Sequence, residues 1–297
     1  MLDWLEITPD YRCNNRCLGC FSAQDGGPSM SPREMLEALS RAHRDGARSL
    51  WLGGGEPTMR RDLFALVSAA RKLGYTRVKL QTNGMMLAYP EFARRCADAG
   101  VTEVSFSVKG ATEEMHDRLA QTPGCHALMV QGMEQVRALG LGLEADLLVY
   151  KSNVGTVPEM VRAYAPRGVA HFRVWLLSAM DRDGDEVRAE VPRVSEAARA
   201  IVAAMDLGLS TRPDFISSLH TPPCTVPGSH HACLFDAAAL NMLVSNPGGF
   251  AFKLEASPIE GGHYLPRCDG CKYRPRCRGL RADYLRLHGD AEFRPPE

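Results

Sequence analysis

The chain has 297 residues, of which 45% are hydrophobic and 24% are charged. This is the composition of a folded globular protein, and it excludes an intrinsically disordered, collagen-like or coiled-coil chain. Lys and Arg together number 35, as do Asp and Glu, so no overall charge would attract a nucleic acid or an anionic membrane, and we expect neither as a partner.

Strand and helix patterns alternate along the first two thirds of the sequence. Ser31 and Glu34 predict a capping box at the start of the first helix, and Gly74 and Gly100 predict helix ends. The predicted strands are residues 4–8, 49–52, 78–81, 103–108, 144–149 and 171–177. The predicted helices are residues 32–45, 63–73, 90–99, 158–164 and 195–207, with one more helical region before residue 144 that contains Gly132 and Gly140.

This alternation predicts an α/β fold with a parallel sheet and right-handed crossovers, whose functional residues follow the strand ends. An acidic stretch, residues 181–186, is predicted to be a solvated loop. The pattern changes after Gly208, where prolines and cysteines become frequent and residues 246–249 predict the turn of a hairpin. We therefore expect two domains, residues 1–208 and residues 209–297.

Cysteines are the unusual feature of the composition, because the chain has ten of them. The first residues carry acidic side chains where a secretion signal needs basic ones, and no apolar run is long enough to cross a membrane. We therefore expect a cytoplasmic protein, in which clustered cysteines bind metals or act as thiols instead of forming disulfides.

Eight of the cysteines lie in two groups. Cys13, Cys17 and Cys20 have the spacing C-x3-C-x2-C, and three close thiolates suit a [4Fe–4S] cluster that leaves one iron open to another ligand. The alternative is a zinc site, which would need a fourth protein ligand. The second group is Cys224, Cys233, Cys268, Cys271 and Cys277.

The first cysteine group and the sequence Gly53-Gly54-Gly55-Glu56-Pro57 follow the first and second predicted strands. Together they resemble the radical S-adenosylmethionine (SAM) superfamily. The resemblance implies a partial (β/α)6 TIM-type barrel and a cluster whose open iron is chelated by SAM. It also implies an electron donor such as flavodoxin or ferredoxin.

The resemblance implies positions that bind the cofactor. Glycine lets the backbone approach a ligand closely, and Glu56 could accept a hydrogen bond from the SAM ammonium. The implied cofactor-binding residues are Phe21, Gly53, Gly54, Gly55, Glu56, Asn83, Ser105 and Ser107. Asn83 and Gly84 could instead form only a turn, and Lys109 after the fourth strand could be merely solvated.

The C-terminal cysteines resemble the auxiliary iron–sulfur extensions called twitch and SPASM domains, which implies a small extension with a β-hairpin and a helix. The chain departs from that pattern, because no cysteine follows Gly249 closely and none follows Cys277. One auxiliary [4Fe–4S] cluster would fit, held by Cys268, Cys271, Cys277 and either Cys224 or Cys233. A cluster with three cysteine ligands and an open iron is an alternative. Zinc is the alternative here as well, with His230 and His231 beside Cys233.

The expected activity is reductive cleavage of SAM to a 5′-deoxyadenosyl radical that abstracts a hydrogen atom from a small metabolite or a peptide. An auxiliary cluster favours an oxidative outcome. The alternatives are a peptide maturase that cross-links or epimerises a precursor peptide, and a non-catalytic iron–sulfur or zinc scaffold. Epimerisation needs a hydrogen donor, for which Cys125 is a candidate, although a free cysteine is more often inert packing.

Overall fold

The computed structural model describes residues 1–22, 27–180, 182–257 and 261–295. These residues form one curved sheet with the strand order β7-β6-β5-β4-β3-β2-β1-β8-β9. Its strands are β1 (Trp4–Ile7), β2 (Ser49–Leu52), β3 (Arg77–Thr82), β4 (Glu103–Val108), β5 (Gly142–Val149), β6 (His171–Leu176), β7 (Ile216–Ser218), β8 (Met242–Ser245) and β9 (Ala251–Lys253). All neighbouring strands are parallel except β8 and β9, which form the predicted antiparallel hairpin.

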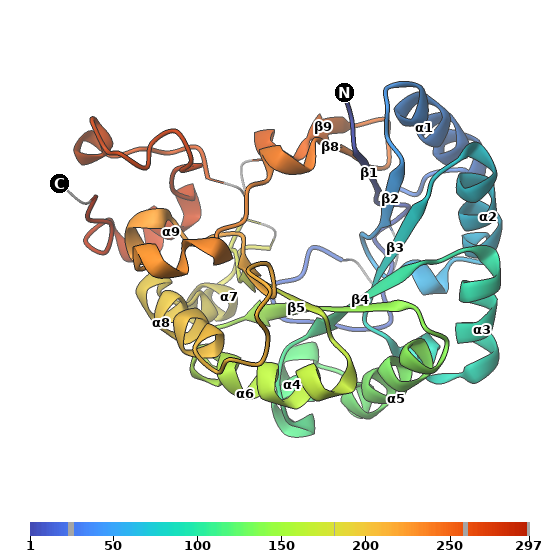
Figure 1. The fold of residues 1–297 in the computed structure, drawn as a ribbon, viewed down its shortest axis with the longest axis horizontal. Coiled ribbons are helices and arrows are strands. Elements are labelled where there is room, and N and C mark those ends of the chain that lie inside the picture. The colour runs from blue at the N-terminus through green and yellow to red at the C-terminus, as the bar shows by residue number, and fades with distance from the viewer. Residues whose placement is uncertain (23–26, 181, 258–260, 296–297) are drawn as a thin grey trace.

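Helices cover the outer face of this sheet, so that the strands form an open arc with helices around it (Figure 1). They are α1 (Pro32–Arg44), α2 (Leu63–Leu73), α3 (Pro90–Ala99), α4 (Glu113–Ala120), α5 (Cys125–Ala138), α6 (Val157–Tyr164), α7 (Asp185–Glu190), α8 (Val194–Met205) and α9 (Ala282–His288). Parallel neighbours require such crossover connections, so the predicted α/β fold and partial barrel are confirmed.

Local sequence explains why several helices begin and end where they do. Ser31 accepts a hydrogen bond from the Glu34 backbone, and the Glu34 side chain accepts one from the Ser31 backbone, which is the predicted capping box. Helices α2 and α3 end at Gly74 and Gly100, whose φ angles of 103° and 113° are left-handed. A residue with a side chain would be strained at these two positions.

The structure differs from the sequence prediction in two connecting regions. The helical region before β5 is two helices, because Pro123 interrupts it and Gln121 and Gly124 have left-handed φ angles of 50° and 78°. Residues 182–184 of the acidic stretch lie in the predicted loop, but Asp185 and Glu186 begin α7, and Asp181 lies outside the described residues. Val187 of α7 is buried at 5% exposure and belongs to the main core.

The residues after Gly208 add strands to the barrel sheet. Strand β7 pairs with β6, and β8 pairs in parallel with β1, so that Trp4 lies opposite Met242. In Figure 1, β8 and β9 lie beside β1 at one end of the arc, while α9 lies near α8 at the other end. The division at Gly208 remains a proposal, and the sheet continues across it.

The inner face of the sheet carries charged side chains. Arg173 on β6 bonds to Asp146 on β5 at 2.8 Å and also contacts Glu144, while Lys79 on β3 lies 2.6 Å from Glu144. The main apolar core lies on the other face, between the strands and the helices. Within the described residues, no helix has the length and apolar character needed to cross a membrane.

Candidate active site and auxiliary cysteine site

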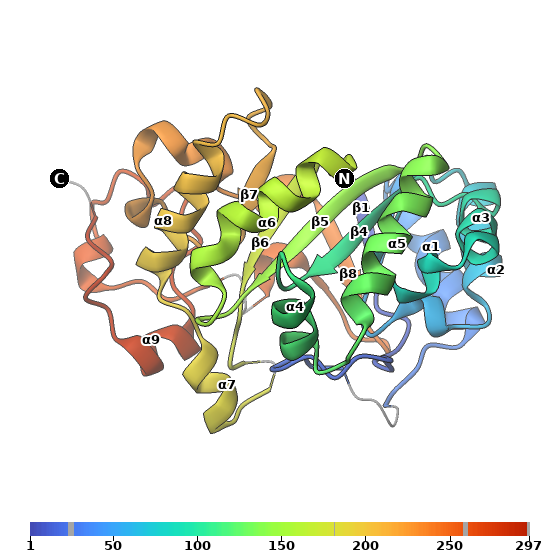
Figure 2. The same cartoon turned by 90° about the horizontal axis from the view of Figure 1, so that it is seen from below.

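The loop that follows β1 carries Cys13, Cys17 and Cys20, and it lies at the carboxyl ends of the strands. Figure 2 shows this loop below the strands, alongside α4. The backbone N–H groups of Arg16 and Leu18 donate to the last carbonyls of α4, at 3.2 and 3.1 Å. The N–H of Cys20 donates to the carbonyl of Cys17 at 3.2 Å. These bonds hold the three cysteines at the end of the barrel where active sites form.

The glycine-rich loop after β2 packs directly against the cysteine loop. Gly55 N–H donates to the Asp10 carbonyl at 3.0 Å, and Glu56 N–H donates to the Arg12 carbonyl at 2.7 Å. A Cβ on Gly55 would overlap the Arg12 carbonyl, and Gly54 has a left-handed φ of 93°. Gly54 and Gly55 therefore let the glycine-rich loop pack closely against the cysteine loop, and this requirement for glycine does not depend on any ligand.

Glu56 holds the glycine-rich loop to the end of β3. Its Oε1 accepts from Thr58 N–H at 3.0 Å, from the Thr58 hydroxyl at 2.5 Å and from the Thr82 hydroxyl at 2.7 Å, and its Oε2 accepts from Asn83 N–H at 2.7 Å. Burial raises the pKa of Glu56, and these donors oppose the rise because they stabilise the ionised form. Only Oε2 retains lone-pair capacity for a ligand.

Asn83 forms the predicted turn and also contacts the cysteine loop. Its Oδ1 accepts from Met85 N–H at 3.0 Å in a turn, and Gly84 has a left-handed φ of 84°. Its Nδ2 donates to Asn14 Oδ1 at 2.7 Å and lies 3.9 Å from Cys13 Sγ. The turn thus places the Asn83 amide against the cysteine loop.

One cavity of about 290 Å³ brings most of the predicted site together. This size is close to the lower limit for cavities that bind small molecules. The predicted site residues that line it are Cys13, Cys17, Cys20, Phe21, Gly54, Gly55, Glu56, Asn83 and Ser107. Gly53, Ser105 and Cys125 are not among its lining residues.

Ser105 and Ser107 both point to the inner face of β4, but they lie at different depths. Ser105 is fully buried, and its Oγ accepts from Arg173 at 3.2 Å. Ser107 is two residues closer to the carboxyl end of the strand, a rise of about 7 Å, and it reaches the cavity. In this structure Ser105 bonds to Arg173 inside the barrel and does not line the cavity, so its predicted cofactor role gains no support.

Cys125 is also placed away from the cavity. It begins α5, it is 1% exposed, and its thiol donates to Asp117 Oδ1 at 3.2 Å. Burial and the Asp117 carboxylate raise the pKa of Cys125 to about 12. A buried thiol bonded to a carboxylate cannot reach a substrate in the cavity, so the hydrogen-donor role is not supported by this placement.

Other cavity residues have no motif that would identify them from sequence. Lys109 is 3% exposed, and although burial opposes its charge, the sulfur atoms of Cys17 and Cys20 outweigh that effect and raise its pKa. Glu6 on β1, Tyr150, Trp175 on β6 and His220 also line the cavity. Lys109 continues the inward alternation of Ser105 and Ser107 along β4.

The cavity fits the cofactors that the resemblance implies. Burial raises the pKa of Cys13 to about 12, so a bound cation is needed to keep this sulfur as a thiolate. Lys109 provides a positive charge for a carboxylate, and Glu56 Oε2 provides an acceptor for an ammonium group. A zwitterion such as the methionine part of SAM would find a partner for each charge.

The C-terminal cysteines form a second cavity. It is lined by Cys224, Cys268, Cys271 and Cys277, together with Tyr264 and Tyr273. Burial raises the pKa of Cys224 to about 11, and the sulfurs of Cys277, Cys268 and Cys271 add to the rise. Four cysteine residues therefore line one cavity, and four is the number of cysteine ligands that a fully ligated [4Fe–4S] cluster takes.

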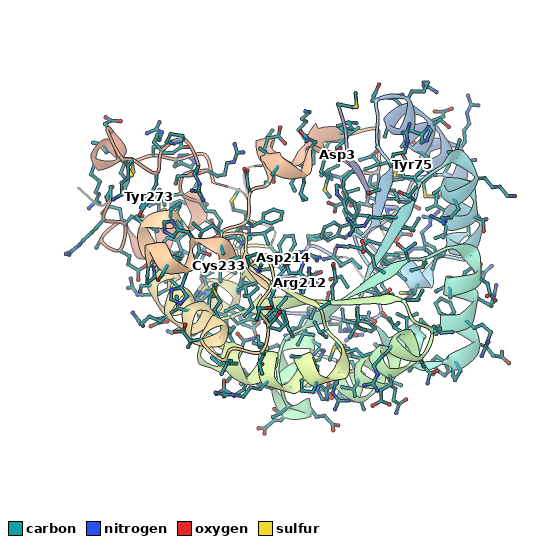
Figure 3. The ribbon with its side chains drawn as sticks, in the orientation of Figure 1. Asp3, Tyr75, Arg212, Asp214, Cys233 and Tyr273 are labelled. Atoms are coloured by element: carbon teal, nitrogen blue, oxygen red, sulfur yellow. The ribbon has the colours of Figure 1, made fainter. Side chains whose placement is uncertain are left out.

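Cys233 does not belong to this cavity. Its side chain is completely buried in the main core, and its pKa is raised to about 11 by burial, with no contribution from another cysteine. Figure 3 shows Cys233 apart from Tyr273, which lies in the segment between Cys271 and Cys277. Of the two candidates for the fourth ligand, the geometry therefore favours Cys224.

The predicted histidines of a zinc alternative are engaged elsewhere. His231 Nε2 bonds to the carbonyls of Pro223 and Val226 at 3.1 and 3.0 Å, and His230 Nε2 lies 2.9 Å from Asp206. In the part of the chain that the structure describes, no three His, Cys, Asp or Glu side chains are close enough together to hold a single metal ion.

Comparison with known proteins identifies relatives of this arrangement. Residues 7–151 match the family described as the Radical SAM superfamily. The chain is 32% identical over 188 residues to the mycofactocin maturase MftC of Mycobacterium ulcerans, covering 62% of this chain and 49% of that protein. It is 32% identical over 161 residues to the PqqA peptide cyclase of Rhodopseudomonas palustris, covering 53% of this chain and 41% of that protein. The chain thus spans about half the length of these relatives or less.

Solved structures share the fold. SuiB of Streptococcus suis bound to the precursor peptide SuiA superposes with a TM-score of 0.68 at 15% identity, covering 85% of this chain and 59% of that chain. The structure named anSMEcpe with bound AdoMet has a TM-score of 0.58 at 16% identity, and the match covers 70% of this chain and 58% of that chain. At these identities the likeness establishes a common fold and nothing more.

Proposed function

We propose that this chain, which belongs to the radical SAM superfamily, binds SAM at the three-cysteine cavity and uses it to oxidise a peptide. The observation that carries the proposal is that Cys13, Cys17 and Cys20 line the same cavity as Glu56 and Lys109. When bound, the cluster and SAM supply a one-electron cleavage that produces a radical able to take a hydrogen atom from the substrate.

In this proposal, the protein residues of the cavity bind the cluster and SAM and orient them. Cys13, Cys17 and Cys20 would hold the cluster, which leaves one iron open to SAM. Lys109 would neutralise the SAM carboxylate, and Glu56 Oε2 would accept a hydrogen bond from an N–H of the SAM amino group. Because both side chains are almost fully buried, water competes little for these contacts.

Phe21, Gly54, Gly55, Asn83 and Ser107 complete the proposed cofactor site. Phe21 is 46% exposed and packs edge-on against Tyr11, with ring centroids 5.8 Å apart, so its free face is available to the adenine. Asn83 and Ser107 offer polar atoms on the wall formed by β3 and β4. An external donor such as flavodoxin or ferredoxin would deliver the electron.

The second cysteine site is proposed to hold an auxiliary [4Fe–4S] cluster with Cys224, Cys268, Cys271 and Cys277 as ligands. A cluster with four protein ligands has no open iron, which suits an electron acceptor for an oxidative reaction better than a substrate-binding site. The extension formed by residues 209–297 would then serve the redox chemistry of the barrel.

A peptide substrate is favoured by the relatives. The PqqA peptide cyclase acts on a peptide by its name, and SuiB was solved with a precursor peptide. A small-molecule substrate is the second candidate, since the chain is also 28% identical over 165 residues to a probable GTP 3′,8-cyclase of Sulfolobus acidocaldarius.

The proposal is tested by reconstituting the protein anaerobically and supplying SAM and dithionite. We expect about eight irons per chain for two [4Fe–4S] clusters, and formation of 5′-deoxyadenosine. The variant Cys17→Ala should hold about half of the iron and form no 5′-deoxyadenosine. The control Cys96→Ala removes a buried thiol of α3 outside both cavities and should retain both properties.

Turnover retained by Cys17→Ala would refute the radical SAM assignment. Four irons with one zinc in the wild-type protein would refute the auxiliary cluster, and no 5′-deoxyadenosine from a fully loaded protein would favour the scaffold alternative.

A further inference from the structure

Two ring side chains stand side by side on the wall of the three-cysteine cavity. Trp175 is the next-to-last residue of β6, and His220 follows β7 by two residues. Their ring centroids are 6.1 Å apart with an interplanar angle of 72°. Both side chains line the cavity that holds Cys13, Cys17 and Cys20.

Each ring carries a buried nitrogen without a hydrogen-bond partner among the described residues. These atoms are Nε1 of Trp175 and Nε2 of His220. The other nitrogen of His220, Nδ1, accepts from the backbone N–H of Leu176 at 3.3 Å, so the ring proton is assigned to Nε2. Both unpartnered atoms are therefore donors, and buried donors are nearly always paired in folded proteins.

The pair is electrically neutral. Indole has no charge, and burial together with the nearby Arg281 guanidinium lowers the pKa of His220 well below its ordinary value. Two neutral N–H donors complement a neutral carbonyl oxygen, which has two lone pairs. An ionic ligand would gain less here, because it would lose its hydration without meeting an opposite charge from either ring.

His220 also borders a further hollow, distinct from the two cysteine cavities. Leu176, Pro222, Pro223 and Leu280 line this hollow as well, and the last three of these also line the auxiliary cysteine cavity. Cys224 follows His220 by four residues in the sequence. His220 therefore lies where the three-cysteine cavity and this hollow meet.

We propose that the Nε1–H of Trp175 and the Nε2–H of His220 bind one backbone amide carbonyl of the substrate and orient it in the cavity. This inference rests on the proposed function, because it presumes a substrate with amide groups. It assigns to this pair a binding role that no sequence motif indicates.

The experiment uses the oxidised, cluster-loaded protein with ¹⁵N-labelled indoles, because the chain has only three tryptophans and gives three indole signals. The probe is Ala-Gly-Ala with an acetylated N-terminus and an amidated C-terminus, and sodium propionate serves as the carboxylate probe. We expect the peptide probe to shift the Trp175 indole signal, which the variant Trp175→Phe identifies, and to leave the Trp4 and Trp51 signals in place. Propionate should leave all three unchanged.

Variants of His220 test whether this residue contributes to binding of the peptide probe. His220→Phe keeps the ring shape but removes the donor, and it should weaken probe binding about two- to tenfold, as expected for one neutral hydrogen bond. His220→Gln returns an N–H near the same position and should restore most of the affinity. The matched control is Trp51→Phe. It removes another indole N–H without a hydrogen-bond partner among the described residues, and Trp51 does not line the cavity. The Trp51→Phe variant should bind the probe as tightly as the wild type.

The inference is overturned if the Trp175 signal stays in place up to the solubility limit of the peptide probe, if propionate shifts it equally, or if His220→Phe binds the probe as tightly as the wild type. Formation of 5′-deoxyadenosine from SAM and dithionite without any probe should occur in the wild-type protein and persist in the control Trp51→Phe, whose residue does not line the cavity. Its absence in the wild-type protein would instead count against the proposed function, so the two failures are distinguishable.

Discussion

Glu56 illustrates how one residue can serve both the fold and a ligand. Its Oε1 is used by three donors from Thr58 and Thr82, so this atom is structural, whereas Oε2 has a single donor, the Asn83 backbone. A carboxylate oxygen can accept more than one hydrogen bond. Glu56 therefore orders the loop and still has one acceptor free for the cofactor.

The identity of the fourth auxiliary ligand is a residue-scale question with a direct test. Because Cys224 faces Cys268, Cys271 and Cys277, we expect Cys224→Ala to lose the auxiliary iron, leaving about four irons per chain. Cys233→Ala should retain about eight, although it leaves a small hole in the core. Iron and sulfide analysis of both reconstituted variants measures this, and equal retention would mean that neither cysteine is a ligand.

At the scale of elements, the glycine-rich loop depends on close backbone approach. Gly55→Ala would press a methyl group onto the Arg12 carbonyl, since backbone cannot move aside as a flexible side chain can. We expect this variant to lose the iron of the three-cysteine site, to keep the auxiliary iron, and to be destabilised by about 1–3 kcal/mol.

The matched control for Gly55→Ala is Gly155→Ala, because a Cβ at Gly155 would meet no atom within 4 Å. Metal analysis and anaerobic denaturation of the two variants provide the measurement. If Gly55→Ala bound iron as well as Gly155→Ala does, the close packing of the two loops would not be required for the site.

Elements formed by local signals could be predicted, and elements formed by packing could not. The capping box at Ser31 and the end of α3 at Gly100 depend on neighbouring residues alone. Strand β7 is only three residues long, and it forms because Ile216 and its neighbours pair with β6, far away in the sequence. Helix α7, which the sequence pattern did not predict, likewise packs Val187 into the core.

For the whole molecule, the charged interior of the barrel makes stability depend on pH. Burial, with a contribution from the Asp146 charge, raises the pKa of Glu6 to about 7 from 4.5. The folded state therefore binds this proton more tightly than the unfolded state, and Glu6 lowers stability progressively as the pH rises from 4.5 to 7. Burial lowers the pKa of His171 to about 4 from 6.5, so His171 costs stability as the pH falls from 6.5 to 4.

The contributions of Glu6 and His171 to stability have opposite pH dependence over overlapping pH ranges, and a variant of Glu6 separates them. Glu6→Gln should be more stable than the wild type by about 1–3 kcal/mol at pH 8 and nearly equal to it at pH 5, because Gln carries no charge to bury. Anaerobic thermal unfolding at the two pH values measures the difference, in which the His171 contribution cancels. The control Glu37→Gln, at an exposed position of α1, should show no such dependence, and an equal gain at both pH values would contradict the assignment.

The sequence by itself determined the features that depend on short-range spacing. These are the alternation of strands and helices, the three cysteines after β1 and the glycines after β2, because a few consecutive residues suffice to set a local geometry. Only the tertiary structure showed that Cys224 and Ser107 line the two cysteine cavities and that Cys233 and Ser105 do not. It also brought Trp175 and His220 together. Each of these depends on which side chains meet after the sheet forms. Hydrophobic periodicity shows which face of an element is buried, but it does not show which distant side chains that face will contact.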